Sequence, residues 1–338
     1  MQARRQAASQ RRRPGAGAAL ALALCLNLGL CPLAAAADHA LLVGVSAYPG
    51  LPGRSLEGPA NDVRLMQQTL AGMGLAEDQL TVLAERGGGL PTRTNILRSL
   101  ARLANQSQPG DWVLVYFSGH GAQVPQRPAS PGERVEGDGL DEVFLPRDTQ
   151  HWDAQRQEVR GALRDKELGA ALRRIQARGA HVWAVFDTCH AADMLRGPGG
   201  AAAWRFLGPE ALHIPMSLWS ERWRNSLRRQ LPGLRSGAAA VPRKVGAPAP
   251  GRYIGFFSSQ EGEGTFEVLL PDPQDPAQQR RYGLFTYQLA VAARDWTGGL
   301  GELARRIEQG YRERPFPTPQ FVGELEGTQP FRRSASPS

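Results

Sequence analysis

The sequence predicts an α/β protein with a mostly parallel sheet covered by helices on both faces. Short apolar runs rich in β-branched and aromatic residues alternate with stretches whose apolar residues recur at helical spacing. This alternation is typical of parallel strands joined by helical crossovers. Two of the apolar runs, 112–117 and 182–186, break into polar residues that include His120 and Cys189. Such residues gather at the carboxyl edge of a sheet, where ligands and chemistry collect.

The first 37 residues are expected to be a secretory signal peptide. Five arginines and no acid precede an apolar run over 18–37 that ends in four alanines and Asp38. The alternative is a membrane anchor that is never cut, and we expect cleavage near Ala36 or Ala37. Removal of this segment lowers the formal charge from +8 by its five arginines to +3. The remaining charge gives no argument for a nucleic-acid partner.

Cleavage would also remove Cys25 and Cys31 and leave Cys189 as the last thiol. A single cysteine cannot form an intrachain disulfide, and an unpaired thiol in an oxidising compartment is a liability unless it is buried or useful. Cys189 is therefore a candidate nucleophile. The alternative is a small buried apolar residue.

The remaining elements follow from the same patterns. The apolar runs predict strands, which cover 39–47, 79–83, 111–117, 182–186, 253–259 and 319–325. The helical spacing predicts helices, which begin near 59, 92, 163, 284 and 303. Asn61 or Asp62 could cap the first helix. A short extended piece is expected within 138–148.

The segment 196–250 breaks the pattern. It is rich in Gly, Ala, Pro and Arg, and we expect a basic, partly mobile insertion. Residues 38–330 form the expected folded domain around it. A disordered tail is expected over 331–338.

The thiol needs a base, because the thiolate is the nucleophile and a nearby histidine lowers the thiol pKa. Among the six histidines, His120 lies between two glycines at the other strand end. His190 is adjacent to Cys189, and neighbouring side chains after a strand point apart. We therefore pair His120 with Cys189. The alternative is a turn histidine with structural partners.

The residues 116–121 (Tyr-Phe-Ser-Gly-His-Gly) and 187–191 (Asp-Thr-Cys-His-Ala) resemble the paired histidine and cysteine motifs of caspase-like cysteine peptidases, in the metacaspase and bacterial caspase-like branch. The stretches 42–48, 56–62, 255–259 and 283–287 look like that family as well. The resemblance implies a caspase–hemoglobinase fold with a six-stranded, mostly parallel sheet between helices. It implies a large-subunit-like region over 39–195 and a small-subunit-like region over 251–325.

The resemblance further implies a cysteine endopeptidase. Cys189 would attack the scissile carbonyl, and His120 would activate the thiol or protonate the leaving amine. Backbone N–H groups of Gly121 and Cys189 would form the oxyanion hole.

The family pattern also suggests a substrate-binding set, which falls on Asp62, Ser118 and Asp187. Two carboxylates favour a cationic side chain, arginine above all through a bidentate contact. We therefore predict cleavage after Arg or Lys. The alternatives are that Asp62 only caps its helix and that Asp187 only braces the cysteine loop.

No cofactor is predicted, and calcium is where the chain departs from the pattern. Many metacaspases hold an activating calcium through several acids. Asp138, Asp141 and Asp165 match that set, whereas Lys166 and Arg196 stand at positions where acids are expected. Calcium prefers several anionic oxygen ligands, so these two cations oppose binding. Asp193 is a speculative substitute.

The sequence thus predicts an exported, periplasmic or secreted, caspase-like endopeptidase whose partners are proteins or peptides with Arg or Lys before the scissile bond. No membrane partner is expected after signal removal. The arginines of the insertion are candidate self-cleavage sites, namely Arg222, Arg224, Arg228, Arg229, Arg235 and Arg243. The alternative function is a catalytically silent caspase-like module that binds peptides or partner proteins in the cell envelope.

Overall fold

The fold is known from a computed structural model that describes residues 37–127, 139–188, 203–218, 250–260, 263–312 and 317–331. Cys189 lies outside the described residues, as do the expected signal peptide apart from Ala37, the six candidate self-cleavage arginines and the tail beyond Phe331. No helix in these ranges is long and apolar enough to cross a membrane.

A six-stranded sheet forms the centre of the fold, with the strand order β14-β11-β9-β3-β1-β2. Its first five strands in sequence run parallel, and β14 at one edge pairs antiparallel with β11. The strands are β1 (His39–Gly44), β2 (Leu80–Leu83), β3 (Trp112–Ser118), β9 (His181–Asp187), β11 (Tyr253–Phe257) and β14 (Gln320–Val322). The predicted six-stranded, mostly parallel sheet is confirmed.

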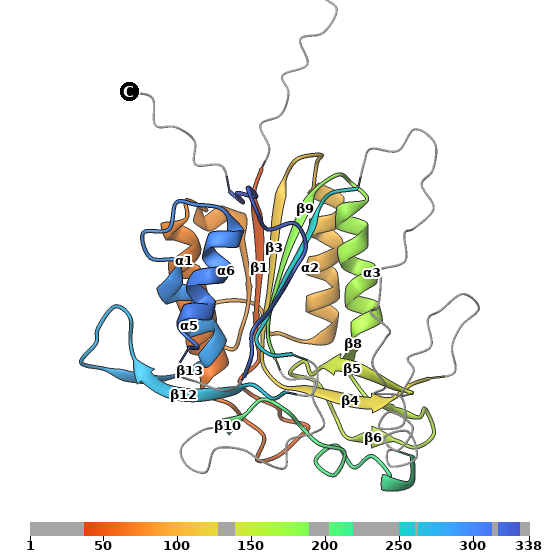
Figure 1. The fold of residues 1–338 in the computed structure, drawn as a ribbon. Coiled ribbons are helices and arrows are strands. Elements are labelled where there is room, and N and C mark those ends of the chain that lie inside the picture. Colours follow the sequence, from red (N-terminus) through yellow and green to blue (C-terminus); the bar gives the residue numbers. More distant parts are fainter. Residues whose placement is uncertain are drawn as a thin grey trace, which may run out of the picture. The chain divides into compact units, whose positions relative to one another are not determined.

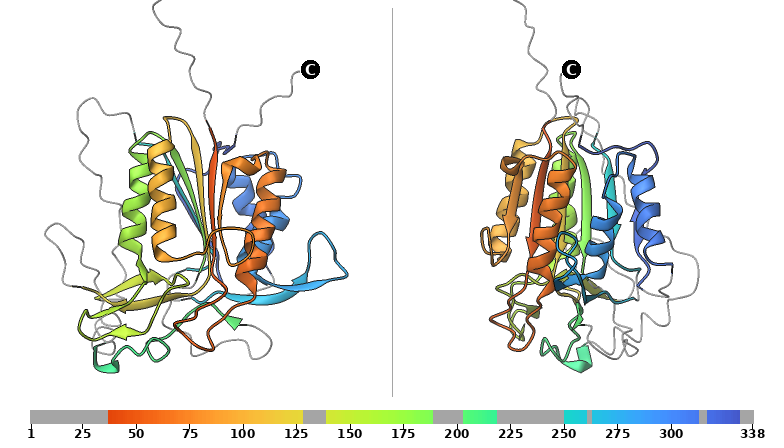
Figure 2. Two further views of the ribbon diagram at one scale, coloured as in Figure 1. Left: turned by 180° about the vertical axis from the view of Figure 1, so that it is seen from behind. Right: turned by 90° about the vertical axis from the view of Figure 1, so that its left-hand side faces the viewer.

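Helices cover both faces of this sheet (Figures 1 and 2). One layer holds α2 (Arg93–Gln106) and α3 (Asp165–Gln176), and the other holds α1 (Gly58–Gly72), α5 (Leu284–Ala292) and α6 (Leu300–Gln309). Successive strand side chains face opposite layers, so β3 and β9, which are buried almost throughout, divide their apolar residues between two cores. The burial of both faces explains why these strands read as continuous apolar runs.

Smaller sheets lie beyond the carboxyl ends of the parallel strands, at the lower end of Figure 1. The first contains β4 (Gly121–Pro125), β5 (Leu140–Phe144) and β8 (Leu163–Arg164). The second contains β10 (Ala203–Trp204), β12 (Phe266–Pro271) and β13 (Gln279–Gly283). The third pairs β6 (Trp152–Asp153) with β7 (Glu158–Val159). A single turn of 3-10 helix, η1 (Glu77–Gln79), precedes β2.

Part of the segment expected to be a basic, partly mobile insertion has defined structure. Residues 203–218 are described, and they contain β10 and the buried side chains of Arg205, Leu207, Leu212 and Ile214. The pattern failed here because the segment is anchored by one buried arginine and scattered apolar residues, which follow neither a helical nor a strand period.

Candidate active site

The two motif strands lie side by side, as predicted. β3 and β9 pair in parallel, and the last pair in register is Ser118 with Asp187. His120 follows two residues after Ser118, and Cys189 follows two residues after Asp187. The sheet therefore delivers both motifs to the same edge.

His120 is placed by its glycine neighbour and by Tyr48. Gly119 has φ +155°, and a Cβ there would lie 2.9 Å from the Tyr48 hydroxyl oxygen, so glycine permits this close approach. The backbone N–H of His120 donates to the Tyr48 hydroxyl at 2.8 Å, and the two rings lie 4.9 Å apart. His120 is only 3% exposed.

The His120 ring has a defined tautomer. Nε2 lies 2.8 Å from the Arg54 carbonyl oxygen, which can only accept, so Nε2 carries the proton and Nδ1 is left as the basic nitrogen. Nδ1 has no hydrogen-bond partner among the described residues. Burial lowers the pKa of His120 to about 4, although the hydrogen bond to the Arg54 backbone opposes this shift. The ring is therefore a neutral base at neutral pH.

The three predicted substrate-binding residues come together beneath this histidine motif. The Ser118 hydroxyl donates to Asp62 Oδ2 at 2.8 Å, and Asp187 stands beside Ser118 in the sheet. All three side chains are fully buried. Asp62 comes from α1, Ser118 from β3 and Asp187 from β9, so the fold brings together residues that are far apart in the sequence.

A guanidinium group occupies the centre of this set. Nη2 of Arg205 lies 2.5 Å from Asp62 Oδ2, and Nη1 lies 3.0 Å from Ser118 Oγ and 3.2 Å from Asp187 Oδ1. Burial alone would lower the pKa of Arg205, but the nearby carboxylates hold its pKa above the ordinary value. Burial raises the pKa of Asp62 to about 6 against the opposing charge of Arg205. At neutral pH the group is thus a cation among carboxylates.

Glu267 is a third acid near this guanidinium. Its Oε2 lies 4.0 Å from Arg205 Nη2 and accepts a 2.8 Å hydrogen bond from the Gly58 N–H, while its Oε1 accepts from the Glu57 N–H at 3.2 Å. An acid at the start of α1 is favoured by the free N–H groups there. We refer to Asp62, Ser118, Asp187 and Glu267 as the acidic cluster.

The alternative N-cap role of Asp62 is not observed, whereas the alternative that Asp187 only braces the cysteine loop stays open. Asp62 does not cap α1, since the N-cap residue is Glu57 and Asp62 Oδ1 instead accepts from the Gly283 N–H at 2.9 Å. Asp187 Oδ2 accepts from the backbone N–H and the hydroxyl of Thr286 at 2.9 and 2.6 Å. Asp187 therefore ties β9 to the first turn of α5 and also contacts Arg205.

Arg205 and Glu267 are the site residues that sequence reasoning missed. Arg205 stands in the composition-biased segment, and Glu267 follows Phe266 in an unpredicted hairpin strand. The one available signal was the aromatic flanking of Arg205 by Trp204 and Phe206 in an otherwise small-residue stretch.

Of the two predicted oxyanion-hole donors, Gly121 is described and Cys189 is not. The Gly121 N–H donates to the Arg205 carbonyl oxygen at 2.8 Å. Cys189, as nucleophile and as second donor, lies outside the described residues, so its role stays a prediction.

Asp141, one of the residues considered for calcium, is engaged with two cations. Asp141 pairs with Arg164 through Oδ2 and with Lys166 Nζ through Oδ1, the latter at 2.7 Å. Asp138, Asp193 and Arg196 lie outside the described residues. Within the described ranges, no three His, Cys, Asp or Glu side chains form a metal-binding group. The two cations on Asp141 therefore disfavour a calcium ion at that carboxylate.

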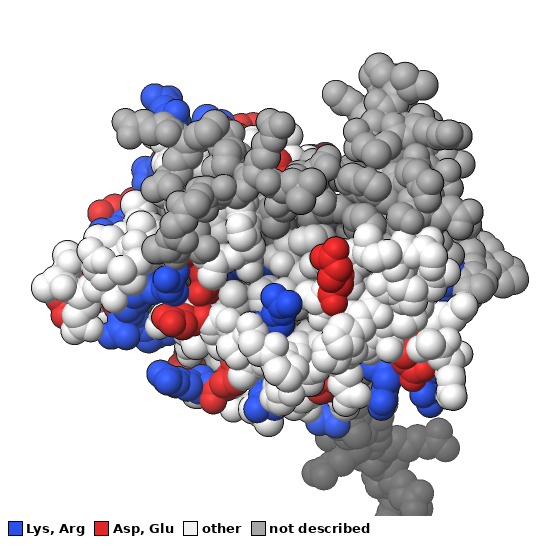
Figure 3. All heavy atoms as spheres, turned by 90° about the horizontal axis from the view of Figure 1, so that it is seen from below, with Lys and Arg blue, Asp and Glu red and all other residues white. Residues whose placement is uncertain are grey.

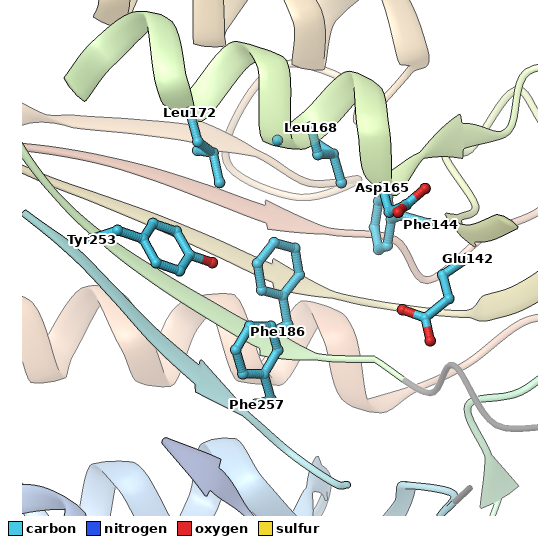
Figure 4. Close-up of a pocket in the computed structure, with 9 residues that line it drawn as sticks. Glu142, Phe144, Asp165, Leu168, Leu172, Phe186, Tyr253 and Phe257 are labelled. Atoms are coloured by element: carbon cyan, nitrogen blue, oxygen red, sulfur yellow. The ribbon is translucent and has the colours of Figure 1, made fainter. Parts of the chain in front are cut away.

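One cavity of about 150 Å³ lies on the other side of the sheet, between α3 and the strands β9 and β11 (Figure 4). Phe186, Phe257 and Tyr253 line it, with the carboxyl groups of Glu142 and Asp165 at one end. None of its lining residues belongs to the acidic cluster or to the histidine motif. It is therefore a separate feature from the candidate active site.

The surface seen from below, on the side of the smaller sheets, carries charges of both signs (Figure 3). Ion pairs among the described residues include Arg280 with Asp272 at 2.8 Å and Arg281 with Glu57 at 3.8 Å. The charge that distinguishes the site is therefore buried in the acidic cluster.

Residues 38–198 match the family model described as "Metacaspase, peptidase C14 domain". Metacaspase-1 of Candida albicans is 33% identical over 159 residues, which are 46% of this chain and 33% of the relative. Metacaspase-1 of Mycosarcoma maydis is 35% identical over 159 residues, which are 46% of this chain and 36% of the relative. The chain thus spans about a third of the length of these curated relatives.

The crystal structure of protein GSU0716 from Geobacter sulfurreducens matches with a TM-score of 0.56 and 22% identity. It covers 85% of this chain and 93% of that chain. This likeness concerns the fold alone, and it extends the agreement beyond residue 198. Fold, motif placement and sequence together define a caspase-like domain. The match of residues 38–198 to the metacaspase model and the similarity to the curated metacaspases support the resemblance that the two motifs predicted.

Proposed function

We propose that this protein is a cysteine endopeptidase that cleaves peptide bonds after Arg or Lys. The observation that carries the proposal is the seating of a guanidinium among Asp62, Ser118 and Asp187, immediately below the His120 motif. The site binds the buried guanidinium of Arg205 through two carboxylates. It therefore has the charge and geometry to bind the guanidinium of a substrate arginine in the same place.

His120 is the proposed base. Its neutral ring and its partner-free Nδ1 support this role, because a base must be unprotonated and within reach of the proton that it takes. The Cys189 thiol gives its proton to the ring, and the thiolate sulfur bonds to the scissile carbonyl carbon. The Gly121 and Cys189 N–H groups stabilise the resulting oxyanion.

The collapse of that intermediate breaks the C–N bond and leaves an acyl thioester on Cys189. The departing amine takes the proton from His120, so the ring returns to its neutral form. Water then attacks the thioester, with His120 accepting a water proton and passing it to the sulfur. The net reaction consumes one water and one peptide bond.

Catalysis without a bound metal is part of the proposal. Lys166 Nζ lies 2.7 Å from Asp141, so an ammonium already neutralises a carboxylate that calcium would need. Export to the periplasm or the medium is proposed as well, on the basis of the five arginines and the apolar run within residues 1–37. Cell fractionation with an antibody to the folded domain tests export, and accumulation in the cytoplasm would contradict it.

Fluorogenic peptides ending in Arg, Lys or Asp test the activity, with Cys189→Ala as the matched control. We expect thiol-dependent release after Arg and Lys that Cys189→Ala abolishes. Release after Asp alone would contradict the role of the acidic cluster. No release from any peptide, with or without calcium, would favour the alternative of a silent peptide-binding module.

A further inference from the structure

The segment 203–207 lies against the candidate active site as a short strand, a bend at Arg205 and an isolated bridge between Phe206 and Gly121. Its first two residues form β10 and pair antiparallel with β12, and the Arg205 N–H donates to the Thr265 carbonyl oxygen at 3.1 Å. Its last residues pair with the histidine motif, where Leu207 N–H donates to the Gly121 carbonyl oxygen at 3.0 Å. The segment thus pairs through its backbone with β12 on one side and with the first residue of β4 on the other, and such backbone pairing is one way in which a peptide binds to a protein.

The backbone carbonyl of Arg205 contacts one of the proposed oxyanion-hole donors. Its oxygen accepts the Gly121 N–H at 2.8 Å. A donor proposed to hold the oxyanion of a substrate is thus holding the carbonyl of residue 205. The bond that follows this carbonyl joins Arg205 to Phe206.

The side chain of Arg205 lies among the predicted substrate-binding residues. It enters the acidic cluster, where Nη2 contacts Asp62 and Nη1 contacts Ser118, Asp187 Oδ1 and the Asp187 carbonyl oxygen. Two glycines leave space for it, because a Cβ on Gly58 would lie 2.7 Å from Nη2 and a Cβ on Gly283 would lie 2.5 Å from Nη1. The site is therefore shaped around a guanidinium.

Two features distinguish this arginine from an ordinary structural ion pair. Arg205 Nε is buried and has no hydrogen-bond partner among the described residues, although a buried donor without a partner is costly. In addition, three carboxylates surround a single cation. A purely structural pair needs neither the surplus charge nor the alignment of its carbonyl with Gly121.

We propose that residues 203–207 are an intramolecular substrate mimic, with Arg205 in the position of the residue before the scissile bond. This inference rests on the proposed function, since it assigns the acidic cluster to substrate arginine. In the resting protein Arg205 competes with external peptides for the same carboxylates. A substrate then binds only to the fraction of molecules from which the segment has withdrawn.

Peptide binding in the catalytically disabled Cys189→Ala protein tests this inference. A fluorescent peptide with a C-terminal arginine amide is titrated into Cys189→Ala, alone and combined with Arg205→Ala. The dissociation constant should fall about tenfold or more when Arg205 is removed, because the competing occupant is gone. Arg281→Ala is the matched control, and it should leave the dissociation constant unchanged since Arg281 lies outside the acidic cluster.

A second variant leaves the acidic cluster and Arg205 intact. Leu207→Pro removes the N–H that donates to the Gly121 carbonyl and so weakens the docking of the segment. It should also tighten binding of the arginine peptide, and an otherwise identical peptide ending in aspartate should gain in neither variant. If the Arg205→Ala protein does not fold, the Leu207→Pro protein alone tests whether residues 203–207 compete with the peptide.

The inference is overturned if the folded variants bind the arginine peptide no more tightly than Cys189→Ala alone. It is also overturned if the aspartate peptide gains equally. Both readouts are independent of turnover. A protein that gains affinity in these variants but hydrolyses no peptide would contradict the proposed peptidase activity while leaving the substrate mimic in place.

Discussion

Ser118 and Asp187 are the last register partners of β3 and β9, and each stands two residues before a motif residue, His120 in one case and Cys189 in the other. This pairing fixes the carboxyl ends of the two central strands side by side. The acidic cluster lies directly beneath the motifs because Ser118 and Asp187 belong to both features. Specificity and chemistry are thus built on the same two strands.

The neutral state of His120 predicts how acid affects stability. Burial lowers its pKa to about 4, whereas the unfolded chain titrates near 6.5. Between these values the unfolded state binds the proton and the folded state does not, so stability is lost as the pH falls from 6.5 to 4. The expected loss attributable to His120 is about 3 kcal/mol.

Urea denaturation of the wild type and His120→Gln at pH 7, 5.5 and 4 measures this contribution. Asp62 acts in the opposite direction, because its raised pKa adds stability as the pH falls from about 6 toward 3.8. That effect is common to both proteins and cancels in the difference. Equal acid sensitivity of the two proteins would show that His120 is not held neutral by burial.

Asp62→Asn should slow the hydrolysis of arginine substrates. The change removes the charge that lies 2.5 Å from the seated guanidinium while it keeps the shape of the side chain. We expect kcat/KM for arginine peptides to fall about 100-fold or more, since loss of one partner of a buried charge pair costs roughly 3–5 kcal/mol. Asp78→Asn, an exposed acid in η1, is the matched control.

Thermal melting must accompany the kinetics of Asp62→Asn, since the same residue accepts bonds from Ser118 and Gly283. A folded Asp62→Asn protein with unchanged kcat/KM for arginine peptides would remove Asp62 from the specificity site.

Chelation of divalent ions should leave the activity unchanged. Asp141 is already paired with Arg164 and Lys166, and two cations oppose the approach of a third. Hydrolysis of the arginine peptide in excess EGTA, compared with excess calcium, checks this expectation. Calcium-dependent activity would mean that residues other than Asp141 complete a site.

The sheet and the helices could be predicted because their apolar residues repeat with a clear period. β3 and β9 are buried on both faces, and the leucine and isoleucine positions of α2 face one core. The hairpin of β12 and β13 was missed, and its second strand, Gln279–Gly283, lacks an apolar pattern because most of its residues are polar or charged. The hairpin is defined by the backbone pairing of its two strands, which a repeat of apolar residues in the sequence does not reveal.

The acidic cluster could be predicted only in part. Asp62, Ser118 and Asp187 were accessible through their motifs, whereas Glu267 and Arg205 depend on contacts between residues far apart in the chain. A buried arginine in a stretch rich in glycine and alanine looks like a surface residue in sequence. Its burial follows from three carboxylates that the fold assembles from α1, β9 and β12.

Affinity labelling tests the central claim most directly. A peptidyl chloromethyl ketone that ends in arginine alkylates a thiol fastest where its side chain is held near that thiol, and peptide mass mapping identifies the modified residue. We predict a single adduct on Cys189, formed faster in Arg205→Ala than in the wild type, and no adduct from the matching aspartyl reagent. Failure of the arginine reagent to modify Cys189 in either folded protein, or equal labelling by the aspartyl reagent, would contradict the account.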